Sequence, residues 1–403
     1  MLGAPASRTL SRVRSPLAHL LSLAVCAATS QGCYRSQEPA DAAAACPPRV
    51  RACDAWEPDG APTALATGEA LRVGDVLAQD CSVVALWADD DGVSVHHVTR
   101  VIDWTGVPVS EPTILADLTF DRATDTHPRL TRGAGGVSAL VTGPEGCVWA
   151  PLDLDGRLRG PVAPIGDTAG RACRGFGPAP DGTSFLSSRS PDHALSLWTL
   201  DEAGAVTERQ PIGPLGAEAT TRLDQPDGTF LVGWRERAEP GAPVETTLRR
   251  FDASGRPRGP MTGLGQDVSR LVIAATRTSP ILFSAGAGAD GLPLRIQPID
   301  HDGRRRGESR TVPAEQVSDL AAARAFSGDL LLAWMERRAD APSRLRTLAV
   351  EPRGTPAGPV VDIPAEDLRN DLRLVIHSGG ARALLLYSDT HHVRAQPLRC
   401  AHF

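Results

Sequence analysis

The chain repeats one short pattern from its first quarter to its end, and this repetition limits the folds that it can adopt. Aligning the pattern on the glycine of an Asp/Glu-x-x-Gly turn gives seven copies, at Gly60, Gly106, Gly156, Gly204, Gly255, Gly303 and Gly354. Successive glycines are 46, 50, 48, 51, 48 and 51 residues apart. Aspartate caps such a turn through local hydrogen bonds and glycine supplies the positive φ of a tight hairpin, so each copy predicts a hairpin turn.

An apolar run precedes most of the turns, as in VVALW from Val83, FLVGW from Phe230, LLLAW from Leu330 and ALLLY from Ala383. Runs of this kind predict strands buried on both faces, and the more alternating segments after them, such as LSLWTLD from Leu195, predict strands with one wetter face. Four strands of about six residues and four short connections come to roughly fifty residues, the size of a propeller blade. The sequence therefore predicts an all-β fold, a seven-bladed β-propeller with four-stranded blades of about 49 residues.

The repeat is divided between the two ends of the chain. The first copy begins in the middle of a unit, with no such run before its turn, and the last copy, ALLLYSDTHHVRAQPLRC, stops before any turn. A closed ring can use this division, because strands from both termini complete one blade and leave few exposed edges. We therefore expect a propeller over residues 49–403 whose last blade is closed by both termini.

The repeated unit, an hhhhW run followed by a strand and Asp-x-x-Gly, resembles that of the bacterial envelope β-propeller repeat lipoproteins. The likeness covers residues 48–403. The resemblance implies an architecture only, because the motifs of this group carry no catalytic residue.

The amino terminus has the order of a secretory signal. Arg8, Arg12 and Arg14 precede an apolar run of 12 residues that ends at Ala28 and is too short to span a bilayer. We predict a signal peptide over residues 1–32 and a tether or linker over residues 33–48. Cys33 resembles a lipid-attachment cysteine, which favours an exported, lipid-anchored protein of the cell envelope. Cleavage near Ala28, which would give a periplasmic or secreted protein, is the alternative.

The cysteines predict disulfides. There are eight, and six remain if Cys26 is removed with the signal and Cys33 carries a lipid. Cysteines of an exported protein are read as disulfides before metal ligands, and no CxxC pair is present. If the last blade contains both termini, Cys53 and Cys400 lie in one sheet and lock the ring. Cys147 with Cys173 is the next pair and Cys46 with Cys81 the last, among the fifteen pairings that six cysteines allow.

Charge and motifs exclude several functions. The net charge of −6 makes the chain a poor nucleic-acid binder. The pairs His96–His97 and His391–His392 lie in the first and last units, so His97 and His392 could share a zinc or copper ion, although chance surface histidines are the preferred interpretation. The acidic turns around Asp153 and Asp300 indicate turn capping rather than calcium binding. We predict no cofactor and find no nucleophile, zinc-protease or phosphate-loop motif.

The leading functional hypothesis is a non-catalytic binding or scaffolding propeller of the bacterial cell envelope, with an unknown protein or glycan partner. The alternative is a propeller enzyme, a hydrolase or lyase acting on sugars or lactones, with a metal or polar site at the central channel. A purely structural envelope component is a third possibility. A ring of acids, histidines or arginines at equivalent positions of the inner strands would favour the enzyme, and the sequence alone does not reveal such a ring.

Overall fold

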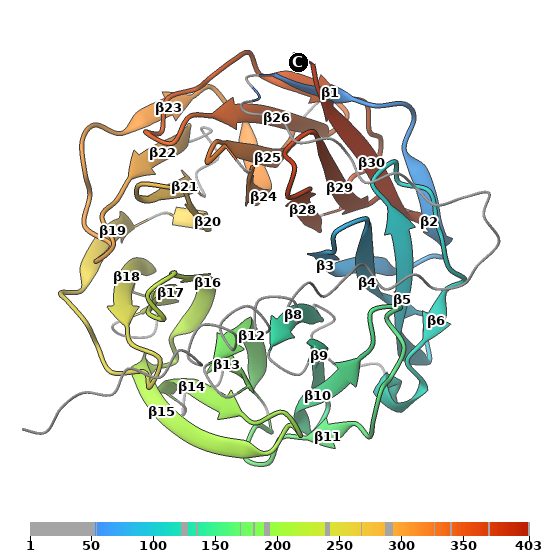
Figure 1. Cartoon of the computed structure of the whole chain (residues 1–403). Helices are drawn as coiled ribbons and strands as arrows, with labels where there is room; N and C mark the ends of the chain where they lie inside the picture. The colour runs from blue at the N-terminus through green and yellow to red at the C-terminus, as the bar shows by residue number, and fades with distance from the viewer. Residues whose placement is uncertain are drawn as a thin grey trace, which may run out of the picture. The chain divides into compact units, whose positions relative to one another are not determined.

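The chain forms a ring of seven antiparallel β-sheets, each with four principal strands, as the sequence predicts (Figure 1). The computed structural model describes Cys53 and residues 55–121, 128–133, 136–169, 171–179, 182–188, 194–237, 242–266, 268–286, 293–325, 327–338, 341–369 and 371–401. The predicted signal peptide and tether lie outside these residues.

Each of the first six blades is a continuous segment whose first strand is innermost. Blade 1 contains β3 (Leu71–Ala78), β4 (Ser82–Asp90), β5 (Ser94–Asp103) and β6 (Thr113–Ile114), followed by the 3₁₀ turn η1 (Ala116–Leu118) and by β7 (Phe120–Asp121), which also pairs with β5. Blade 2 contains β8 (Arg129–Gly133), β9 (Gly136–Gly143), β10 (Gly146–Leu152) and β11 (Ala163–Pro164). Blade 3 contains β12 (Ala172–Ala179), β13 (Gly182–Ser188), β14 (Ala194–Leu200) and β15 (Val206–Leu215).

The other three blades that are continuous in sequence follow the same order. Blade 4 contains β16 (Glu218–Asp224), β17 (Phe230–Glu236), β18 (Glu245–Phe251) and β19 (Thr262–Gln266). Blade 5 contains β20 (Val268–Ala275), β21 (Pro280–Gly286), β22 (Leu294–Pro298) and β23 (Arg310–Val312). Blade 6 contains β24 (Gln316–Arg324), β25 (Leu330–Arg337), β26 (Arg344–Val350) and β27 (Val361–Ile363).

Blade 7 is built from both ends of the chain, which confirms the predicted closure. Its first three strands are β28 (Leu372–Ile376), β29 (Arg382–Ser388) and β30 (His392–Cys400). The outer edge comes from the amino-terminal side, where β1 (Trp56–Pro58) and β2 (Thr63–Thr67) both pair with β30. Two ion pairs hold the amino-terminal segment to this sheet: Asp59, directly after β1, pairs with Arg382 of β29, and Glu57 of β1 pairs with Arg399 of β30.

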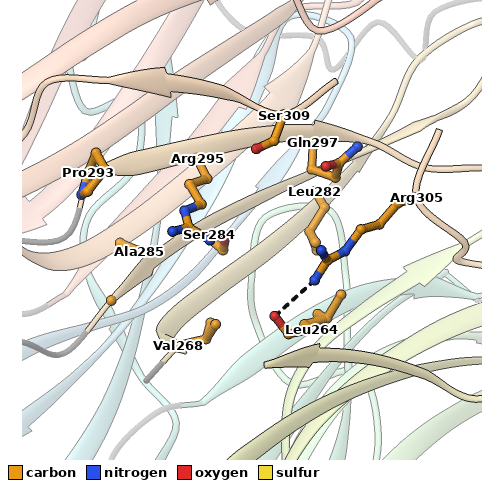
Figure 2. Close-up of a pocket in the computed structure, with 11 residues that line it drawn as sticks. Leu264, Val268, Leu282, Ser284, Ala285, Pro293, Arg295, Gln297, Arg305 and Ser309 are labelled. Atoms are coloured by element: carbon orange, nitrogen blue, oxygen red, sulfur yellow. Dashed lines mark hydrogen bonds between the residues drawn. The ribbon is translucent and has the colours of Figure 1, made fainter. Parts of the chain in front are cut away.

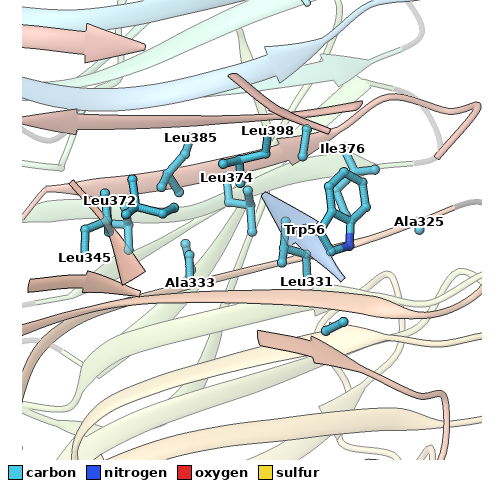
Figure 3. Packing of buried hydrophobic residues seen from close by; sticks show 14 of the residues in the cluster. Trp56, Ala325, Leu331, Ala333, Leu345, Leu372, Leu374, Ile376, Leu385 and Leu398 are labelled. Carbon is cyan, nitrogen blue, oxygen red and sulfur yellow. The ribbon is translucent and has the colours of Figure 1, made fainter. Parts of the chain in front are cut away.

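The predicted apolar runs are the second strands of the blades, and each run contacts two neighbouring blades. In β25, Leu332 and Trp334 pack on blade 5, whereas Leu331 and Ala333 pack on blade 7. The side chain of Trp56 enters the same core from β1 and is almost fully buried (Figure 3). Alternate residues of a strand point to opposite faces, so an unbroken apolar run fills both interfaces at once.

The Asp/Glu-x-x-Gly turns join the third and fourth strands of the first six blades; blade 6 has Glu351 at the first position and the other five have aspartate. In blade 2, Asp153 Oδ1 accepts hydrogen bonds from the backbone N–H groups of Asp155 and Arg157, at 2.9 and 2.8 Å. Gly156 has a φ of 78°, in the region that favours glycine. The carboxylate of Asp300 caps the turn of blade 5 in the same way. Capping therefore accounts for these aspartates.

Gly60, however, is not a copy of this turn. It lies between β1 and β2, whereas the other six glycines lie between a third and a fourth strand. The missing turn of blade 7 would lie between Cys400 and Trp56, which pair with each other at the point where the chain is divided. This displacement explains why the first spacing, 46 residues, is the shortest of the six.

Candidate ligand site in the central channel

The innermost strands of the seven blades surround the axis of the ring (Figure 1). Their residues form the wall of a central cavity of about 460 Å³. Every blade contributes to this wall. The described residues that line the cavity include six arginines and three carboxylates, an excess of three positive charges in a chain whose net charge is −6. The cavity is thus basic within an acidic protein.

One or more charged residues come from each innermost strand. Around the ring they are Asp75 on β3, Arg129 on β8, Arg174 on β12, Glu218 and Arg222 on β16, Arg270 on β20, Asp319 on β24 and Arg373 on β28. The sixth arginine, Arg235, lies on the neighbouring strand β17. This is the ring of charged side chains that the sequence did not reveal.

Backbone bulges place four of the cavity residues. The inner strands of blades 1, 4, 5 and 6 each contain one extra residue, Gly74, Thr220, Ser269 or Ser318, and their register with the second strand shifts there. The residue that follows the bulge is Asp75, Thr221, Arg270 or Asp319, respectively, and each of these four lines the cavity. Bulges commonly re-aim a side chain at a functional site, and here the same irregularity recurs in four blades.

The two bulge aspartates tie neighbouring blades together. Asp75 accepts a hydrogen bond from the N–H of Val76 and another, at 2.8 Å, from the N–H of Leu130 in blade 2. Asp319 does the same with Leu320 and with Leu372 of blade 7, both at 2.9 Å. Burial raises the pKa of Asp319, while the guanidinium groups of Arg373 and Arg270 act in the opposite direction.

Two arginines are held in place by uncharged backbone oxygens. Arg270 donates from Nε to Ser318 O in blade 6 and from Nη1 to Ser269 O at 3.2 Å. Arg373 donates from Nε to Gly74 O in blade 1 at 2.8 Å and from Nη1 to Leu372 O at 2.7 Å. Among the described residues, the Nη2 group of neither side chain has a hydrogen-bond partner. Backbone oxygens of the wall therefore orient both guanidinium groups. Arg373 also forms a long ion pair with Asp75, Nε to Oδ1 3.9 Å, and its charge acts to lower the pKa values of the buried Asp319 and Asp371.

The arginines of blade 4 differ from these two. Arg222 forms an ion pair with Asp224 at 2.7 Å and donates three further hydrogen bonds to carbonyl oxygens of blade 3. Arg235 pairs with Glu218 at 2.8 Å. Arg222 thus joins blade 4 to blade 3, and the carboxylate of Glu218 is occupied by its ion pair with Arg235.

The histidines singled out from the sequence do not line this cavity. His97 lies on β5 and is fully buried rather than on the surface, with Nδ1 2.6 Å from Leu118 O and its ring edge-on to Phe120. His392 lies on β30 with Nδ1 3.1 Å from Asp389 Oδ1. In the part of the chain that the structure describes, no group of three or more His, Cys, Asp or Glu side chains is arranged to hold a metal ion.

Two of the predicted disulfides are present. Cys53 and Cys400 are bonded, with their Cα atoms 5.7 Å apart, and this bond closes blade 7. Cys147 of β10 is bonded to Cys173 of β12, with a Cα separation of 5.9 Å, and joins blade 2 to blade 3. Cys81 is also in a disulfide. Its predicted partner Cys46 and the predicted lipidation site Cys33 lie outside the described residues.

A second, smaller pocket of about 250 Å³ lies where blade 4 meets blade 5 (Figure 2). Leu264 and Leu282 form part of an apolar wall, and Arg295, Gln297 and Arg305 supply polar groups. Arg305 donates from Nη2 to Leu264 O at 3.2 Å, which ties the loop before β23 to β19. The described residues that line this pocket come from two blades, whereas those around the axis come from all seven.

Comparisons with known proteins agree on the fold. No family model matches the sequence, and no curated protein matches it. The chain is similar to a solved chain of Kuenenia stuttgartiensis hydrazine synthase, with a TM-score of 0.51 and 11% identity over 82% of this chain and 96% of that chain. It is also similar to the Dos1 propeller, with a TM-score of 0.47 and 9% identity over 82% and 78% of the two chains. At 11% identity the likeness to the hydrazine synthase chain shows the fold alone.

The described residues contain no helix of the length and apolar character required to cross a lipid bilayer.

Proposed function

We propose that this protein is an exported, non-catalytic binding propeller of the bacterial cell envelope that holds a ligand in its central channel. The observation that carries the proposal is the convergence of charged side chains from all seven blades on one cavity. Ligand sites are typically concave and contain a few well-placed polar groups, and the central cavity has both properties.

The chemistry of the cavity favours binding over catalysis. A general acid or base needs a titratable group that can reach the substrate. Asp75 and Asp319 each accept two backbone hydrogen bonds, and Glu218 pairs with Arg235. No histidine occurs among the described residues that line the cavity. Arginine remains protonated at all physiological pH values and serves to bind rather than to transfer protons.

The disulfides support an exported protein. Bonds such as Cys53–Cys400 and Cys147–Cys173 persist in oxidising compartments and are rare in the bacterial cytosol. The amino-terminal arginines and apolar run add a secretory signal, and Cys33 supplies a site for lipid attachment. Mass spectrometry of the mature amino terminus tests the anchor: a diacylglyceryl group on Cys33 supports it, and an unmodified terminus near Ala28 contradicts it.

A cavity-filling variant tests the channel as the ligand site. Thr221 lines the cavity, so we expect Thr221→Trp to abolish the stabilisation that a ligand from a small-molecule library gives in thermal unfolding. Leu154→Trp is the matched control, because Leu154 is exposed on the turn of blade 2. Ligands that stabilise both variants equally would place binding outside the channel.

One observation favours the alternative, an enzyme that acts on sugars or lactones. Asp319 has a raised pKa and lies within the influence of two arginines, which is a common setting for a catalytic acid. Turnover of a glycoside or lactone that is lost in Asp319→Asn and kept in Thr221→Val would support the enzyme. Absence of turnover across such substrates, with and without divalent metal ions, supports the binding protein.

A further inference from the structure

We propose that the central cavity binds a compact anion that carries at least two carboxylate or phosphoryl groups, and that Arg270 and Arg373 are its principal contacts. This inference rests on the proposed ligand site and names the chemistry of its ligand. The starting point is the excess of three positive charges among the described residues that line the cavity, in a chain with a net charge of −6.

The first argument is the way in which the two arginines are held. Carbonyl oxygens of the bulge at Ser318 and of the bulge at Gly74 accept hydrogen bonds from the Nε atoms of Arg270 and Arg373. A carbonyl oxygen orients a guanidinium group but does not cancel its charge. A pre-oriented arginine loses little side-chain entropy when it binds an oxyanion, and guanidinium geometry matches both carboxylate and phosphate.

The second argument concerns the competing acids. Among the described residues, the only carboxylate oxygen within 4 Å of Arg373 is Asp75 Oδ1, 3.9 Å from Nε, an ion-pair distance that is too long for a hydrogen bond. Asp319 and the buried Asp371 also feel the charge of Arg373, but neither forms a hydrogen bond with its guanidinium group. Asp75 and Asp319 direct their oxygens to backbone N–H groups of the wall. The wall thus satisfies these carboxylates, and the Nη2 groups of Arg270 and Arg373 remain without partners among the described residues.

The third argument concerns the size and valence of the ligand. Arg270 is on β20 and Arg373 is on β28, and β24 with Asp319 lies between them. An anion that contacts both arginines therefore presents negative groups in two directions. A cavity of about 460 Å³ is in the lower part of the range of roughly 300–1,000 Å³ that small-molecule sites occupy, which favours a compact molecule over a polymer.

Isothermal titration calorimetry of the purified propeller tests the ligand class. Citrate is the carboxylate probe, pyrophosphate is the phosphoryl probe and acetate is the monovalent comparison, each at low and at physiological ionic strength. We expect citrate, pyrophosphate or both to bind about tenfold or more tightly than acetate, and added salt to weaken them. The two probes distinguish a carboxylate ligand from a phosphorylated one.

Substitutions then place the anion. Arg270→Gln should weaken the tighter probe by about tenfold or more, whereas Arg304→Gln, an equal loss of charge on the exposed turn of blade 5, should not. Because Arg270 also joins two blades through a hydrogen bond, a second pair of variants, at Thr221, leaves the side-chain hydrogen bonds of the wall intact. Thr221 occupies the bulge position that Arg270 occupies in the next blade, and its side chain has no hydrogen bond to a described residue.

Thr221→Glu adds a negative charge to the cavity, and Thr221→Gln adds the same volume without charge. We expect Glu to abolish binding of the probe and Gln to retain most of it. Equal binding by the two variants, or no binding of either multivalent anion to the wild type, overturns the inference. If the protein instead binds an uncharged ligand and Thr221→Trp abolishes that binding, the proposed ligand site is supported and only the proposed anionic chemistry of the ligand is wrong.

Discussion

His97 illustrates at the scale of one residue how burial decides the chemistry of a side chain. The sequence predicted a surface histidine, with a metal ligand as the alternative. Because adjacent residues of a strand point to opposite faces, only one histidine of each pair could join a shared metal site. The structure puts His96 on the wetter face, where its Nδ1 lies 3.2 Å from Thr119 Oγ1, and His97 inside the blade. Burial lowers the pKa of His97 to about 4.

The first prediction follows from this shift. The pKa of His97 is lowered in the folded state, so as pH falls below the ordinary value the unfolded chain takes up a proton that the folded chain excludes. Stability linked to His97 is therefore fully present above about pH 6.5 and is lost as pH falls towards 4, with a loss of about 2 kcal/mol at about pH 5. Denaturant unfolding of the wild type and His97→Gln at about pH 7.5 and 5 measures it. Between these two pH values the free energy of unfolding should fall by about 2 kcal/mol less in the variant than in the wild type. Equal losses in the two proteins would contradict the lowered pKa of His97.

At the scale of the elements, the sequence predicted the parts of each blade whose signal is local. The Asp-x-x-Gly turns and apolar runs each lie within about ten residues, so the third-to-fourth-strand turns and the buried second strands could be located. The inner strands could not be delimited, because a bulge interrupts their alternation and each contributes only one or two charged residues. A signal is nevertheless present in VGDV from Val73, VSRL from Val268 and VSDL from Val317, a small residue followed by a charged one between apolar residues. The charges meet only when seven distant strands surround one axis.

The turns provide the second prediction. Asp153→Ala removes the acceptor for two backbone N–H groups, so we expect the free energy of unfolding to fall by about 1–2 kcal/mol. Asp155 lies two residues further along the same turn, and its side chain has no hydrogen bond to a described residue. Asp155→Ala should therefore change the stability by less than about 0.5 kcal/mol. Urea denaturation of the two variants makes the comparison, and equal effects would show that the carboxylate of Asp153 does not cap the turn.

At the scale of the whole molecule, the ring depends on the bonds that join its two ends. Blade 7 lacks the Asp-x-x-Gly turn that connects the outer strands of the other blades, and the Cys53–Cys400 bond lies where this turn would be. The three pairs of β1 and β30, the ion pairs of Arg382 and Arg399 and the buried ring of Trp56 add non-covalent closure.

The third prediction compares the two described disulfides. The Cys53–Cys400 bond spans 347 residues and the Cys147–Cys173 bond spans 26, and the chain-entropy estimates are on the order of 5 and 3 kcal/mol. The double variant Cys53→Ala/Cys400→Ala should therefore be the less stable of the two double alanine variants in denaturant unfolding. Its β1 amides should also exchange hydrogen faster than those of the inner strands. A larger loss of stability in the Cys147→Ala/Cys173→Ala variant would show that closure of the ring does not dominate.

The position of Cys53 also decides how the propeller carries mechanical load. Cys53 precedes Trp56 in the chain, so tension applied to the preceding segment reaches the disulfide before it reaches β1. The force then passes through a covalent bond into β30, a strand paired with its neighbours along its whole length. Without this bond the same force would act on the three residues of β1 alone and open their hydrogen bonds one after another. A propeller held at its amino terminus, as a lipid on Cys33 would hold it, is thereby pulled as one closed ring.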